Sequence, residues 1–157
     1  MANSGSRFKQ INNLRRLVSN SGGLVTSYTY DARGRMLTAN RGGQLTTFTY
    51  RPSGQVATAT LPHGHSITYT YDSAQRLTGW SDNRGGSGAY VLDGMGNRTR
   101  EDIRNAQGQL VWRLARTINT NNRVESVTLG SKTVTYGYDA NGDWVGTFLT
   151  HDRLPRV

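Results

Sequence analysis

The sequence predicts an all-β protein built from tandem antiparallel β-hairpins with meander topology. Three observations predict this fold. Aromatic-x-aromatic segments recur about every 20 residues, an Asp-x-x-Gly turn follows most of them, and a second Gly-rich turn comes about ten residues later. Turns at this spacing leave room only for short strands that return beside one another.

The aromatic segments set the period of the repeat. Their last residues fall at positions 30, 50, 71, 92 and 138, so the intervals are 20, 21, 21 and 46 residues. A degenerate copy at residues 118–124 divides the longest interval into 26 and 20, and a further weak copy is expected near Phe8. All eight tyrosines lie in these segments.

Each segment is expected to be one strand of a hairpin. In the copy that begins at Tyr28, alternation of side chains places Tyr28 and Tyr30 on the same face. Asp31 is expected to accept hydrogen bonds from turn amides, and Gly34 to supply a positive φ. Arg35 then starts the returning strand. The residues assigned to this repeat are Tyr28, Tyr30, Asp31, Gly34, Tyr50, Gly54, Tyr69, Tyr71, Asp72, Tyr90, Asp93, Tyr136, Tyr138, Asp139 and Gly142.

The repeat also predicts how hairpins join and where the array ends. Second turns are expected at residues 41–44, 62–65, 84–88 and 105–108, with residues 84–88 as a flexible loop. The tyrosine pairs of neighbouring hairpins are expected to form aromatic cross-strand contacts. Residues 1–20 are interpreted as a degenerate repeat or lead-in, 21–145 as the hairpin array, and 146–157 as an irregular tail.

The pattern Tyr-x-Tyr-Asp-x-x-Gly-Arg-Leu, met at residues 28–37 and again at 69–77, resembles the YD (Rhs) repeat. That repeat characterises bacterial Rhs proteins, the C subunits of insecticidal toxin complexes and the teneurins. The resemblance covers about residues 21–145. It implies an arc of a β-spiral shell, which in bacterial members encloses a carboxy-terminal toxin fragment, in the cytoplasm, until a dedicated secretion system delivers it. It also implies that neighbouring repeat segments or a polypeptide cargo are the partners.

The sequence departs from this pattern in three places. The Asp is missing after Tyr50 and Ile118, so weaker turns are expected there. Residues after Asp143 do not resemble the plug and self-cleavage segment of bacterial members, and Phe148 onward leaves the repeat. The chain is therefore interpreted as a fragment, a truncated paralogue or a remnant, whose open sheet edges favour self-association.

Charge and composition limit the function classes. The net charge is +9, and of 19 basic residues only Lys9 and Lys132 are lysines. Arg35, Arg76, Arg98 and Arg123 are assigned to one repeated slot, so arginine is interpreted as a strand-surface residue, and nucleic-acid binding is expected to be non-specific only. No apolar run reaches the length of a transmembrane helix, and no signal peptide is recognised.

No catalytic, cofactor or metal site is predicted. The one-per-repeat aspartates are interpreted as turn acceptors, and the His63-Gly64-His65 pair lacks a third ligand. Trp80, Trp112 and Trp144 lie outside the tyrosine positions and are expected to cover neighbouring hairpins. A non-enzymatic shell segment is the favoured function. A carbohydrate-binding surface that uses these tryptophans is the alternative, and a nucleic-acid binder is the second alternative.

Overall fold

The computed structural model describes residues 7–11, 14–21 and 24–150, with side chains from 25 to 149. The chain forms two compact units, residues 1–69 and 70–157. Within each unit, consecutive strands pair antiparallel in the order in which they follow along the chain. This confirms the prediction of an all-β hairpin meander.

The described residues of the first unit form six complete strands and most of a seventh. These are β1 (Arg7–Ile11), β2 (Leu14–Ser21), β3 (Leu24–Tyr30), β4 (Met36–Arg41), β5 (Gln44–Tyr50), β6 (Val56–Thr60) and β7 (Ser66–Tyr71). A 3₁₀ turn, η1 (Pro62–Gly64), joins β6 to β7. The sequence repeats every 20 or so residues because two strands and two turns consume that many.

In the second unit, residues 70–150 form seven strands. They are β8 (Leu77–Asp82), β9 (Ser87–Leu92), β10 (Arg98–Arg104), β11 (Leu110–Ile118), β12 (Val124–Leu129), β13 (Lys132–Tyr138) and β14 (Trp144–Thr150). The last strand extends beyond residue 145, where the sequence places the end of the array. Residues 151–157, most of the expected irregular tail, lie outside the described part of the chain. The three-segment division stays a prediction.

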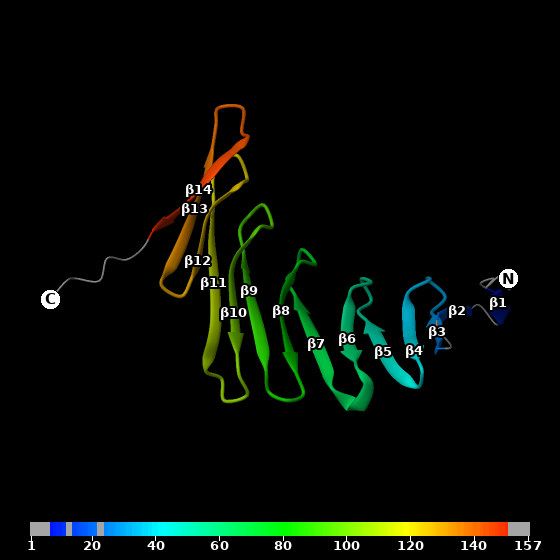
Figure 1. Ribbon diagram of the computed structural model, residues 1–157. Coiled ribbons are helices and arrows are strands. Elements are labelled where there is room, and N and C mark those ends of the chain that lie inside the picture. Colours follow the sequence, from blue (N-terminus) through cyan, green and yellow to red (C-terminus); the bar gives the residue numbers. More distant parts are fainter. Residues whose placement is uncertain (1–6, 12–13, 22–23, 151–157) are drawn as a thin grey trace. The chain divides into compact units, whose positions relative to one another are not determined.

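The described strands of each unit form a single layer (Figure 1). Among residues with described side chains, Ala59 and Asp102 are the only buried ones apart from two glycines. Most strand residues are half-buried, which means that neighbouring side chains on the same face cover one another. A layer of this kind gains its stability from strand pairing and from contacts within each face, because it has no core to fill.

A β-bulge follows most of the turns that come directly after the aromatic segments, and it was not anticipated from sequence. Tyr30 pairs with Met36, but Thr29 pairs with Thr38, so Leu37 is an extra residue on the returning strand. The same shift leaves one extra residue after the turns that begin at 51, 93, 119 and 139. A bulge at a fixed place increases local twist and fixes the register of the hairpin.

Candidate functional site

One five-residue turn recurs along both edges of the hairpins. Counting its first residue as position 1, the position-1 amide donates to the position-5 carbonyl, and the position-4 amide donates to the position-1 carbonyl. In the first copy these bonds are Asp31 N to Arg35 O, 2.8 Å, and Gly34 N to Asp31 O, 3.0 Å. Within the described residues, turns with both bonds begin at 31, 51, 61, 72, 82, 93, 105, 119 and 139.

Position 4 of this turn explains the spacing of the glycines. Its φ is positive in every copy, for example 78° at Gly34 and 86° at Gly142. Residues other than glycine rarely adopt this backbone conformation. Two copies accept a side chain there: Gln75 at 66° and Asn122 at 61°. The glycine of Asp-x-x-Gly is therefore explained by the positive φ at position 4, and the aspartate by the hydrogen bonds that position 1 accepts.

The position-1 side chain accepts the remaining turn amides. Asp31 Oδ1 accepts from the amides of Arg33 and Arg35, both at 2.9 Å. Asp93 accepts in the same way from Met95 at 3.0 Å and Asn97 at 2.8 Å. These bonds stabilise the ionised form.

The pKa values of three turn aspartates lie below the ordinary value of 3.8. For Asp31 and Asp72 the main cause is the position-5 backbone amide, and for Asp93 it is the Asn97 side chain. Carboxylates held in this way act as acceptors for a turn. Their environment does not favour the protonated form that a general acid needs near neutral pH.

Sequence reasoning assigned this capped turn to only one edge. Asp82 begins the same turn on the opposite edge, where Oδ1 accepts from Arg84 N at 2.9 Å and Gly86 N at 2.8 Å. Residues 84–86 are therefore part of a bonded turn, and 87–88 belong to β9, so the expectation of a flexible loop at 84–88 was wrong. Asn105 Oδ1 caps its own turn equally. The Asp-x-x-Gly signal was present at residues 82–85.

The two copies that lack Asp differ from each other. Asn119 Oδ1 accepts from Asn121 and Arg123, both at 3.0 Å, so an amide performs the same role as a carboxylate. At Arg51 the turn keeps its two backbone bonds, 2.8 and 2.9 Å, and Pro52 occupies position 2. The expectation of weaker turns stays a prediction for both copies.

Arginine at position 5 connects one turn to the next turn on the same edge. Arg35 Nε lies 2.7 Å from Asp31 Oδ2, and Nη1 donates to Arg51 O at 3.4 Å. The Arg35 guanidinium also lies over the Tyr50 ring, 4.5 Å from its centroid. Cation–π contact and ion pairing therefore occur on one side chain.

Tyrosine completes this connection in the reverse direction. The Tyr50 hydroxyl donates to Met36 O of the preceding hairpin at 2.6 Å, and the Tyr138 hydroxyl donates to Val124 O at 2.9 Å. In the second unit Arg123 lies over the Tyr138 ring at 5.4 Å and donates to Gly142 O. We call each Arg–Tyr connection between successive turns a rung.

The structure corrects two details of the predicted repeat. Arg98 does not occupy the arginine position, because Asn97 does, and Arg98 lies over the Tyr90 ring at 3.7 Å instead. The second correction concerns the tyrosine pairs. In the first unit their direct cross-strand partners are not aromatic: Tyr28 faces Ala39, and Phe48 faces the buried Ala59, whereas in the second unit Tyr138 faces Trp144. Neighbouring aromatic positions are two strands apart, which is why rungs connect them.

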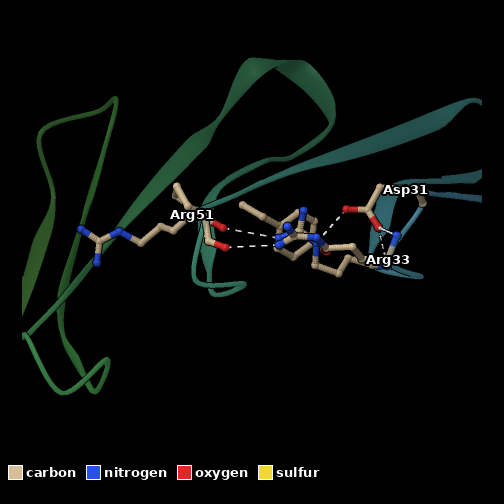
Figure 2. A pocket seen from close by; sticks show the side chains of 7 residues that line it. Asp31, Arg33 and Arg51 are labelled. Carbon is tan, nitrogen blue, oxygen red and sulfur yellow. Dashed lines mark hydrogen bonds and ion pairs between the residues drawn. The ribbon is translucent and has the colours of Figure 1, made fainter.

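A shallow pocket of about 410 Å³ lies between the turns that begin at residues 31 and 51. It is lined by Asp31, Ala32, Arg33, Arg35, Tyr50, Arg51 and Pro52. Figure 2 shows that the Arg51 side chain points away from Asp31, while Arg33 spans the gap and donates to Pro52 O at 3.3 Å. The pocket is the space beside a rung, and its polar groups are engaged across it.

The strands of the first unit have two chemically different faces. One face, the tyrosine face, carries Tyr28, Tyr30, Phe48, Tyr50, Ile67 and Tyr69. The other, the threonine face, carries Thr29, Thr38, Thr47, Thr49, Thr58, Thr60 and Thr68. Cross-strand hydroxyls on this face bond to each other, Thr29 to Thr38 and Thr49 to Thr58, both at 2.6 Å.

The remaining candidate residues are not brought together. Trp80, Trp112 and Trp144 lie on three different strands, opposite Gly88, Ile103 and Tyr138 respectively. In the described part of the chain, no three His, Asp or Glu side chains are grouped to hold a metal ion. Nor does that part contain a helix long and apolar enough to span a membrane.

Comparisons with known proteins agree with this geometry. A family model described as RHS Repeat matches residues 12–43 and 50–87. No curated protein matches the sequence. The fold is similar to part of the Photorhabdus luminescens Tc holotoxin pore with a mutant TccC3, at 16% identity and a TM-score of 0.69, and to part of a TcdB2–TccC3 complex, at 14% and 0.68. Each alignment covers 85% of this chain but only 8% of the other.

Proposed function

The chain belongs to the RHS-repeat (YD-repeat) family, and from that premise we propose that it is a non-catalytic wall segment of a shell that surrounds a polypeptide cargo. The observation that carries the proposal is the single-layer sheet with two half-exposed faces and almost no buried side chain. A layer of this kind separates two compartments, whereas a free-standing domain normally covers one face of its sheet.

The rungs support a wall more directly than they support a binding cleft. Each rung uses its hydrogen bonds and ring contact between neighbouring turns of the same edge, and the ion pair of Arg35 with Asp31 lies within its own turn. The turn carboxylates are likewise engaged with amides and arginines. A catalytic role would need some of these carboxylates, arginines or hydroxyls to be available to a substrate instead of being bonded to one another.

The family resemblance supports a polypeptide cargo. Bacterial members enclose a polypeptide, and the two similar structures are a Tc holotoxin pore with a mutant TccC3 and a TcdB2–TccC3 complex. Because the chain spans 8% of the similar chains, it would form one part of such an enclosure.

Photo-crosslinking from the two faces of one strand tests the proposal. Thr49 and Gln44 are both exposed on β5, Thr49 on the threonine face and Gln44 on the tyrosine face. Each is replaced in turn by benzoylphenylalanine, and the protein is irradiated with a permanently unfolded polypeptide such as reduced, carboxymethylated lactalbumin. We expect crosslinks from one face only. Equal labelling from both faces, or none from either, contradicts a cargo-facing wall.

We also propose that isolated copies associate through β14. Four large apolar side chains on this strand, Trp144, Val145, Phe148 and Leu149, are between 61% and 65% exposed and occupy both of its faces. Exposed apolar strands at a sheet edge pair readily with other strands. Light scattering is expected to show mass rising with concentration, and Phe148→Lys is expected to reduce that rise. A monomer at all concentrations contradicts this.

A further inference from the structure

Hairpin β10–β11 carries an unusual concentration of charge. Its strands hold Arg98, Arg100, Glu101, Asp102, Arg104, Arg113 and Arg116. By contrast, Arg41 is the one charged strand residue in the part of the first unit with described side chains. The two carboxylates are consecutive, so alternation places them on opposite faces of the sheet, and each lies between arginines.

Asp102 is the centre of the more open of these two clusters. Arg113 makes a two-pronged ion pair with it, Nε to Oδ1 at 2.7 Å and Nη2 to Oδ2 at 2.8 Å. Arg100 Nε lies 3.7 Å from Oδ1, within ion-pair range but beyond hydrogen-bond range. Arg104 is two residues further along the same face, and its Nη1 donates to Gly108 O at 3.0 Å.

The arginines of this cluster keep donors for another acceptor. A guanidinium has five N–H donors, and Asp102 uses two from Arg113 and none from Arg100 by hydrogen bonding. The side chains of Arg100 and Arg113 are 49% and 46% exposed, whereas that of Asp102 is 8% exposed. Three arginines around one aspartate leave an excess of two positive charges facing solvent.

On the opposite face, the arginines around Glu101 are less exposed than those around Asp102. There Glu101 is bound by Arg116 at 2.6 Å and Arg98 at 3.3 Å, and the side chains of these arginines are 26% and 38% exposed. Arg98 also lies against the Tyr90 ring. The Glu101 cluster is therefore less exposed than the Asp102 cluster, and the Tyr90 ring already covers one side of the Arg98 guanidinium.

The surroundings of the Asp102 cluster are small and uncharged. The cross-strand row through Asp102 reads Gly79, Ala89, Asp102 and Arg113. The row through Arg100 reads Val91, Arg100, Ala115 and Thr128. The row through Arg104 reads Ser87, Arg104 and Leu110. In these three rows every charged residue belongs to hairpin β10–β11.

We propose that Arg100, Arg104 and Arg113, arranged around Asp102, form a binding site for an acidic polypeptide segment. Guanidiniums match carboxylates in planar, two-pronged geometry. A nucleic acid would need a basic track for successive phosphates and aromatic rings for its bases, and the neighbouring rows hold glycine, alanine, valine and threonine instead. This site does not depend on whether the wall encloses a cargo, because an acidic peptide could bind a free sheet.

Fluorescence anisotropy with a fluorescein-labelled Glu/Asp-rich peptide tests the site, with a Gln/Asn peptide of matched sequence beside it. We expect the acidic peptide to bind, the amide peptide not to bind, and binding to weaken as salt rises. The test variant is Arg100→Gln/Arg104→Gln, which leaves the Asp102–Arg113 pair intact. We expect it to weaken binding about three- to tenfold, as for the loss of two exposed ion pairs.

The matched control is Arg33→Gln/Arg84→Gln, which removes the same charge from two exposed turn residues elsewhere. Circular dichroism first verifies that both variants keep the β-sheet spectrum. We expect the control to bind like the unmodified protein. Equal weakening by both variants would mean attraction to net charge alone, and absence of binding would also overturn the site. So would single-stranded DNA that displaces the peptide and depends on the same two arginines.

Discussion

Removing a single hydroxyl from a rung is the sharpest test of how the hairpins are held together. Tyr50→Phe keeps the ring under Arg35 but deletes the donor to Met36 O, a partly buried bond of 2.6 Å between two hairpins. Both residues that the bond connects are half-buried. We expect a loss of about 1 kcal/mol in the free energy of unfolding, within the usual 0.5–1.5 range for such bonds.

The matched control is Tyr69→Phe. The Tyr69 side chain is half-buried on the same face of the same unit, and its hydroxyl has no partner among the described residues. Urea unfolding followed by circular dichroism measures both variants. With a slope of about 2 kcal/mol per molar urea, Tyr50→Phe should lower the midpoint by about 0.5 M at unchanged slope. If both variants shift equally, the rung hydrogen bond does not hold the hairpins.

Three further predictions concern the turns and the sheet. Asp31→Ala removes the acceptor for two turn amides and should lower the urea midpoint. Asp143→Ala should not lower it, because Asp143 is at position 5 of its turn and its side chain has no described bond. Equal midpoints for the two variants contradict turn capping. Because the turn aspartates have lowered pKa values, their stabilisation should be constant above about pH 5 and fall as pH drops below 3.8, measured as the urea midpoint against pH; a flat profile down to pH 2 contradicts it. Gly88→Ala, whose Cβ would overlap the Trp80 indole, should cost about 1–3 kcal/mol and red-shift tryptophan emission, while Gly146→Ala meets nothing and should do neither.

The fold was predictable because the sequence signal and the structure that it specifies are both local. A turn such as residues 31–35 fixes the pairing of the two strands beside it, and those strands are neighbours in the chain. Sheets built only from sequential hairpins need no long-range decision. Period, strand positions and the role of glycine at position 4 all follow from that rule.

The contacts between hairpins could not be predicted in the same way. The Tyr50 hydroxyl reaches Met36 only because a bulge at Leu37 sets the register of the returning strand. Nothing in the residue types at 36 and 37 indicates a bulge. Arg98 was assigned to the wrong position because it lies five residues after Asp93. Asn97 has the four-residue spacing that Arg35 has from Asp31, and its side chain donates to Asp93.

The two units suggest that the repeat constrains turns more strictly than it constrains faces. The RHS-repeat match ends at residue 87, yet the same capped turns continue at Asp93, Asn105, Asn119 and Asp139. What changes after residue 87 is the side chains on the faces, where hairpin β10–β11 introduces five arginines and two carboxylates. A sheet held by its turns and rungs tolerates such replacement, because strand residues need only cover their neighbours. The faces are therefore where a segment of such a hairpin array can acquire its own binding specificity without losing the turns that pair its strands.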